Sequence, residues 1–149
     1  MNLSDSKAAG YPQTWLQDVW GTWSLIAVQS AADAATHATP EQIRSLRTLT
    51  DQLTALTDGD AWESVAAATY FGLAEASGNQ VYGTLLYDLW QTLADSGDRW
   101  DVAAKLWPIR TWAQQSLREV VAGIASAEPD LARAAMVHHI RGAFAVLHD

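Results

Sequence analysis

The chain has 149 residues, of which 49% are hydrophobic and 17% charged, so it is long and apolar enough to fold around its own core. Its 17 acidic and 9 basic residues give a net charge of −8, which argues against nucleic acid as a direct partner because phosphate binding needs clustered Lys and Arg. The absence of cysteine excludes disulfides, thiol nucleophiles and zinc–thiolate sites.

Apolar periodicity predicts helices along the whole chain, beginning with one over about residues 12–35. The side chains on one face of this helix recur at helical spacing: Leu16, Trp20, Trp23 and Ala27. A capping box then opens the second helix. In it Thr39 is the N-cap, Pro40 takes the first helical position and Gln42 reaches back to the cap.

A tight corner is predicted between two middle helices. We expect a capping box of Asp60 and Glu63 to open the first of them, which runs to about Ser77. Gly78 can adopt the left-handed conformation that closes a helix, and the Asn79 side chain can cap the next one. The two helices should therefore be antiparallel neighbours joined by almost no loop.

Two prolines set the boundaries of the later helices. The helix after the corner is expected to run to about residue 94, and Pro108 predicts a break or a fresh start near Trp107. Pro129 lies near the first position of the last helix. One side of that helix carries Met136, Ile140 and Leu147.

Together these segments predict an all-α fold, an antiparallel bundle of six or seven helices. Residues 12–149 would form the domain, and residues 1–11 a flexible N-terminal segment. Because no apolar run approaches the length of a membrane span and the N-terminus has no apolar signal core, we expect a cytoplasmic protein with no membrane partner.

The tryptophan content is unusual, with eight tryptophans against two phenylalanines. A buried indole is costly because its N–H needs a hydrogen-bond acceptor. Two explanations remain open. The indoles either fill the core, or they line a pocket for an apolar or aromatic ligand.

Four segments, in order, resemble the ligand-binding domain of GntR-type regulators of the FadR subfamily, the FCD domain. The run FGLAEASGNQVYGTLL is similar to the helix–corner–helix of that family, and PDLARAAMVHHI to its closing segment. The runs WLQDVWGTWSLIAVQSAADAAT and TPEQIRSLRTLTDQL are similar to its first two helices. The resemblance covers about residues 12–147.

The resemblance implies a helical bundle with a central pocket for a small metabolite. Many members of the family hold a divalent metal there, through an Asp, a His four residues later, and one His from each of two later helices. A winged helix-turn-helix normally precedes the domain and binds DNA. The effector domain itself helps to form a homodimer.

This sequence departs from the family at three of the four metal positions. The Asp aligns with Ala66, the first His with Tyr70, and the later pair with Leu117 and His139. A single imidazole does not hold a transition metal, which needs three or four converging ligands. We therefore predict that the pocket binds no metal and that the protein uses no cofactor.

The first helix departs as well, because a family Arg that reaches a ligand carboxylate aligns with Trp20, and a Glu with Ser24. The pocket thus lacks the usual means of binding an organic acid. We expect it to be aromatic and apolar, with the Tyr70 hydroxyl and the His139 imidazole as polar groups, or else to be filled core. Its predicted ligand-binding residues are Trp20, Trp23, Ala66, Tyr70, Leu117 and His139.

Only 14 residues precede Trp15, too few for a winged helix-turn-helix. The sequence is therefore expected to be either a fragment of a longer regulator or a free-standing effector domain. In both cases we expect no direct binding of nucleic acid by this chain, and a homodimer as its assembly.

Two other functions are weighed against an effector domain. A metal-free enzyme could use Tyr70 and His139 to move a proton, although no nucleophile or phosphate-binding motif supports catalysis. An interaction protein could dock a partner through Trp100 and Trp107. His139 itself could instead be a core histidine with one hydrogen bond.

Overall fold

The computed structural model describes residues 12–96 and 101–147, so the predicted flexible segment 1–11 lies outside the described residues. The described part is helical and contains no strand. The long helices are α2 (Gln13–His37), α3 (Pro40–Gln52), α4 (Gly59–Ala76), α5 (Gln80–Asp95), α7 (Arg110–Ala125) and α8 (Pro129–Leu147). Shorter pieces are α6 (Val102–Leu106) and the 3₁₀ turns η1 (Leu53–Ala55) and η3 (Trp107–Ile109).

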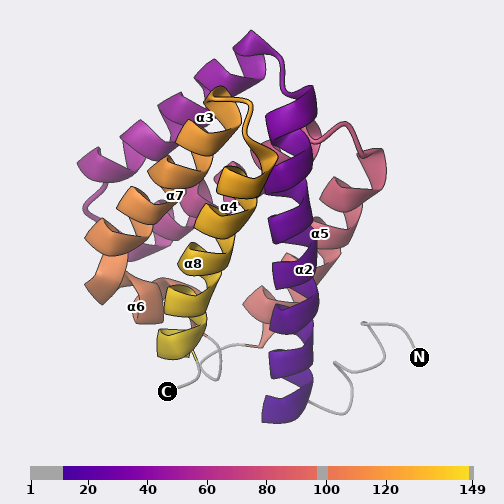
Figure 1. The fold of residues 1–149 in the computed structure, drawn as a ribbon. Coiled ribbons are helices and arrows are strands. Elements are labelled where there is room, and N and C mark those ends of the chain that lie inside the picture. The colour runs from indigo at the N-terminus through magenta and orange to yellow at the C-terminus, as the bar shows by residue number, and fades with distance from the viewer. Residues whose placement is uncertain (1–11, 97–100, 148–149) are drawn as a thin grey trace.

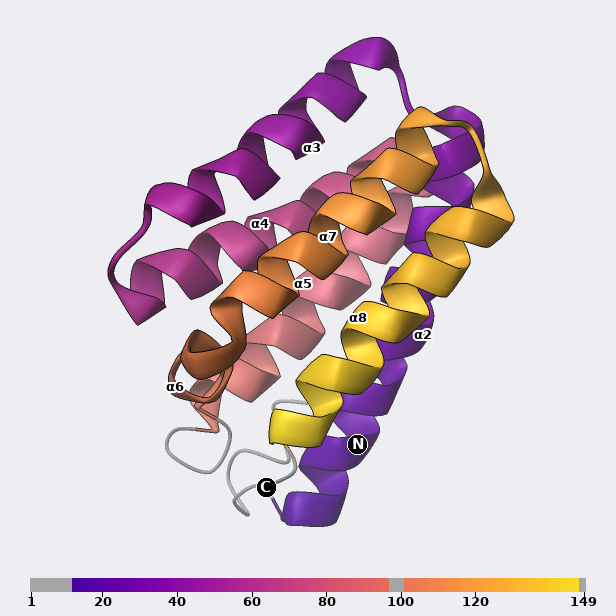
Figure 2. The same cartoon turned by 60° about the vertical axis from the view of Figure 1, so that its left-hand side comes forward.

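Successive long helices run in opposite directions, as Figures 1 and 2 show. Helix α8 packs against both α7 and α2, while α3 lies over α4 and α7, and α4 lies beside α5. The all-α antiparallel bundle predicted from the sequence is therefore confirmed. In the described ranges no helix is both long and apolar enough to cross a lipid bilayer.

The capping box and the tight corner predicted from local sequence are both present. Thr39 Oγ1 accepts a hydrogen bond from Gln42 N at 3.1 Å, and Gln42 Oε1 accepts one from Thr39 N at 2.9 Å, which completes the capping box. Gly78 has φ 82°, in the left-handed region, and Asn79 Oδ1 accepts from Val81 N at 2.9 Å. Hence α4 turns directly into α5.

The predicted capping box of Asp60 and Glu63 is wrong. Asp58 is the N-cap of α4, with its Oδ1 accepting from Asp60 N at 2.8 Å, because the helix already begins at Gly59. Asp60 then lies in the first turn, where a carboxylate favours the positive end of the helix dipole. The Glu63 side chain is left available for another partner.

Pro108 interrupts the helix as predicted, since it lies in the 3₁₀ turn between α6 and α7. Trp107 is half-buried, packs against the core and lies under the Arg110 guanidinium, 4.0 Å from the ring centre. It is therefore not the exposed docking residue that an interaction protein would need. Trp100, the other residue of that hypothesis, lies outside the described residues.

Helices α7 and α8 meet along a close-packed seam, which we define by the contact of Gly123 with Ala132 and the hydrogen bond between Ser116 and His139. A Cβ on Gly123 would lie 2.9 Å from the backbone nitrogen of Ala132, so the two backbones approach closely there. Ala113, Ala132 and Met136 are fully buried. The predicted apolar side of α8, Met136, Ile140 and Leu147, faces the core.

Candidate functional site

A small cavity lies inside the bundle, between α2, α4, α5, α6, α7 and α8. Its volume is about 40 Å³, room for about three water-sized positions at roughly 10–15 Å³ each. All six ligand-binding residues predicted from the sequence line this cavity. The full lining is Trp20, Trp23, Trp62, Glu63, Ala66, Ala67, Tyr70, Trp90, Leu93, Val102, Leu106, Leu117 and His139.

One wall of the cavity consists of aromatic rings from α2 and α4. Trp20 and Trp23 of α2 lie nearly parallel, with ring centres 6.2 Å apart and an interplanar angle of 11°. Tyr70 of α4 meets Trp23 edge-on, with centres 5.0 Å apart. This wall exists because the period of α2 places indoles at i and i+3 toward α4.

His139 reaches the cavity from α8 and is held by α7. Its Nδ1 lies 2.6 Å from Ser116 Oγ, which in turn lies 2.9 Å from the carbonyl oxygen of Ala113. A serine hydroxyl has one proton, so both contacts are satisfied only if Ser116 donates to Ala113 and Nδ1–H donates to Ser116. That tautomer leaves Nε2 as an acceptor, and Nε2 has no hydrogen-bond partner within the described ranges.

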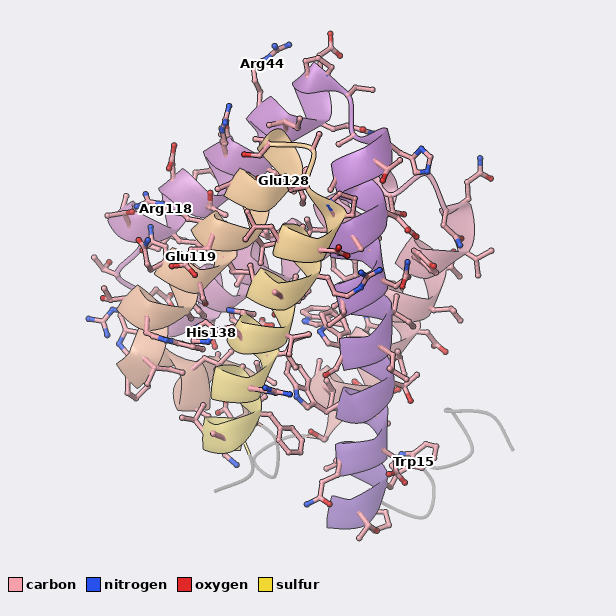
Figure 3. The ribbon with its side chains drawn as sticks, in the orientation of Figure 1. Trp15, Arg44, Arg118, Glu119, Glu128 and His138 are labelled. Atoms are coloured by element: carbon pink, nitrogen blue, oxygen red, sulfur yellow. The ribbon has the colours of Figure 1, made fainter. Side chains whose placement is uncertain are left out.

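The charge state of His139 follows from its burial. Its side chain is 2% exposed, and the indole of Trp112 stacks on it with ring centres 5.9 Å apart. Burial, and then the positive charge of neighbouring His138, lowers the pKa of His139 to about 4. The imidazole is therefore neutral at pH 7. His138 itself is exposed on α8 (Figure 3).

Glu63 is the polar residue that sequence reasoning missed. Its Oε1 accepts a hydrogen bond from Trp90 Nε1 at 3.0 Å, a contact that joins α4 to α5. Burial raises the pKa of Glu63, against the lowering effect of the Trp90 hydrogen bond, and the charges of Asp60 and Asp101 raise it further. Glu63 and Tyr70 are seven residues apart on one helix, a spacing that could have placed both on the same face.

The other polar groups of the cavity are poorly satisfied. The Tyr70 hydroxyl makes no hydrogen bond to any described residue, and its pKa is raised by burial and by Glu63. The indole N–H groups of Trp23 and Trp62 are buried without an acceptor in the described part of the chain. Such groups are rare in a finished core, because an unpaired buried donor costs about 1–3 kcal/mol.

The four residues that the resemblance aligns with the family's metal ligands all line this cavity, but their side chains do not fit a metal ion. Ala66 and Leu117 carry no donor atom, and the Nδ1–H of His139 is already given to Ser116. Across the described residues no three His, Asp or Glu side chains lie close enough to share a metal. A divalent transition metal needs more ligands than Tyr70 and His139 supply.

The same two residues are poorly suited to acid–base chemistry at neutral pH. The Tyr70 and His139 ring centres are 5.9 Å apart, close enough to face one substrate. However, the raised pKa of Tyr70 and the lowered pKa of His139 keep both groups neutral and far from the working range of a general acid or base. The arrangement suits hydrogen bonding to a ligand better than proton transfer.

Comparison with known families agrees with the geometry. A family model for the FCD domain matches residues 22–142, most of the chain. No curated protein matches the sequence. The chain therefore belongs to the FCD domain family, the ligand-binding domains of GntR-type transcriptional regulators.

Proposed function

We propose that this domain binds a small apolar or aromatic metabolite in the cavity between α2, α4 and α8, without a metal, as the effector-binding part of a GntR-type regulator. The observation that carries the proposal is that the four residues which the resemblance aligns with the family's metal positions all line one cavity, in which the buried indole N–H groups of Trp23 and Trp62 have no acceptor among the described residues. A ligand that accepts from these N–H groups and also hydrogen-bonds to the Tyr70 hydroxyl would supply the partners that the cavity lacks.

The size of the cavity sets a condition on binding. Pockets for metabolites measure roughly 300–1,000 Å³, whereas this one measures about 40 Å³. Binding therefore requires the lining to move, and we place the movement at Val102 and Leu106 of α6, because a five-residue helix has few internal hydrogen bonds to hold its shape. Ligand binding would then select an opened form.

Mass spectrometry tests this function directly. Native spectra of the purified protein give its assembly, for which we propose a homodimer, and denaturing spectra release and identify any bound molecule. We expect an organic ligand with no metal. The matched variant is Ala66→Leu, which fills the cavity and should leave the protein folded but empty. Equal ligand in both proteins, or stoichiometric metal in the wild type, would overturn the proposal.

The remaining parts of the proposal follow from composition. The net charge of −8 supports a domain that does not touch nucleic acid itself, so regulation would act through a DNA-binding segment or a partner chain. We place that regulation in the cytoplasm. A filter-binding assay with mixed duplex DNA at low salt should detect no complex with this chain alone.

A further inference from the structure

The polarity of the cavity indicates which ligands it would accept. Among the described residues that line it, Glu63 is the one ionisable carboxyl group, and no lysine or arginine is present. Neither ion pair recorded in the described part of the chain involves Glu63. Asp60 and Asp101 add negative charge near the same carboxylate. A ligand therefore meets a negative potential that no Lys or Arg among the described lining residues balances.

The position of the Glu63 carboxylate is fixed. Oε1 is held by Trp90 Nε1 at 3.0 Å, while Oε2 has no hydrogen-bond partner among the described residues. A carboxylate has about four acceptor sites, so most of its capacity remains for a donor. A ligand ammonium group supplies up to three N–H donors and the opposite charge, which makes the strongest class of hydrogen bond.

The aromatic wall suits the same chemistry. Indole faces attract cations more strongly than the faces of other aromatic side chains, within about 6 Å of the ring centre. Trp20, Trp23 and Tyr70 form such a wall, with centres 5.0 and 6.2 Å apart along the row. A carboxylate ligand would instead face Glu63 and the negative faces of these rings, with no Lys or Arg among the described lining residues to bind it.

We infer that the cavity recognises an amine, whose ammonium head group binds the Glu63 carboxylate against the indole wall while its aromatic or apolar body contacts the remaining lining. The inference rests on the proposed function and specifies its ligand class. It differs from the organic-acid recognition that the family resemblance implies. The cavity as it stands has room for the ammonium head group, and the body of the ligand would enter when α6 moves aside.

Calorimetric titration with matched ligand sets tests the inference. Tyramine, tyrosol and 4-hydroxyphenylacetate share one ring and differ in carrying an amine, an alcohol or an acid, and tryptamine, tryptophol and indole-3-acetate form a second set. At pH 7 we expect each amine to bind about tenfold or more tighter than its alcohol, and the acids weakest. Glu63→Gln, which keeps an acceptor for Trp90, should remove the advantage of the amine and leave the alcohol within about twofold.

Two further variants separate the outcomes. Glu119→Gln removes an equal charge from the outer side of α7 (Figure 3) and should change nothing. Glu63→Asp keeps the charge and should retain part of the preference. If alcohols or acids bind as tightly as amines in the cavity, the inference is overturned while the proposed function stands. If no member of either set binds the folded protein, both are overturned.

Discussion

The seam between α7 and α8 and the aromatic wall of the cavity are both buried. They differ in how closely they pack and in how completely their polar groups are hydrogen-bonded. At the seam the backbones of Gly123 and Ala132 nearly touch, and the Nδ1–H of His139 is paired with Ser116. In the cavity, Trp23 of the wall and the lining residue Trp62 bury N–H groups without acceptors in the described part of the chain.

His139 lies at the boundary between these regions. Its Nδ1 belongs to the hydrogen bonds of the seam, and its side chain also lines the cavity. The difference shows that the core is closely packed and hydrogen-bonded at the seam but leaves polar groups unpaired at the cavity. A protein selected for stability alone would pair or replace the unsatisfied indoles, because each costs free energy.

The largest expected effect is loss of packing next to the seam. Met136→Ala removes a fully buried side chain from α8 and should lower the free energy of unfolding by about 2–5 kcal/mol. Denaturant unfolding measures it. Leu131→Ala on the same helix removes a side chain that is 52% exposed and should cost about 0.5 kcal/mol or less. Equal costs would mean that the seam is not tightly packed.

The second effect is acid sensitivity from His139. Its pKa is about 4 when folded and ordinarily 6.5, so the unfolded state binds more protons between these values. The stability from this group is present above about pH 6.5 and is lost as pH falls toward 4, by about 3 kcal/mol in all. His139→Gln should show a correspondingly flatter fall across that window in unfolding titrations. An unchanged slope would contradict the burial of a neutral imidazole.

A matched pair of valine substitutions compares the regions directly. Ala113→Val adds two methyl groups at a fully buried position of α7, the helix that forms one side of the seam, and should cost about 1–3 kcal/mol by overpacking. Ala66→Val adds the same groups next to the cavity and should be neutral or stabilise by up to about 1 kcal/mol. Thermal unfolding of both variants measures the difference, and an equal loss would show that the cavity has no usable space.

The smallest effect concerns Glu63. Its pKa is raised above the ordinary 4.5, so the folded state holds the proton more tightly and stability falls as pH rises from 4.5 through the raised pKa. Glu63→Gln removes that loss of stability. The melting temperature of the variant should be slightly higher than that of the wild type at pH 7, and nearly the same below pH 4.5. A lower melting point at pH 7 would mean that the carboxylate is stabilised in the ligand-free protein.

The sequence predicts the fold well because its signals are local. The Thr39–Gln42 capping box, the left-handed Gly78 and the break at Pro108 each depend on a few neighbouring residues. The signal fails where two residues compete for one role, as when Asp58 rather than Asp60 caps α4. At the α7–α8 turn the local signal is absent, because Ala127 adopts a left-handed φ of 57° where a glycine would be expected.

The candidate site is predicted less completely. The resemblance aligned four positions, and with the two α2 tryptophans all six residues meet at the cavity. Glu63, Trp90 and the α6 residues were missed, because the Glu63–Trp90 hydrogen bond spans 27 residues of sequence and α6 approaches only through tertiary packing. Cavity size depends on side-chain packing and has no signature in helical periodicity.

One spectrum tests the central claim, that a small ligand occupies this cavity, most directly. Indole ¹H–¹⁵N resonances, assigned by single Trp→Phe variants, can be followed during titration with tyramine. The account predicts shifts for Trp62, Trp23 and Trp90, which line the cavity, and none for Trp15, which lies near the start of α2 (Figure 3). A spectrum in which no indole moves, or in which Trp15 alone moves, would contradict it.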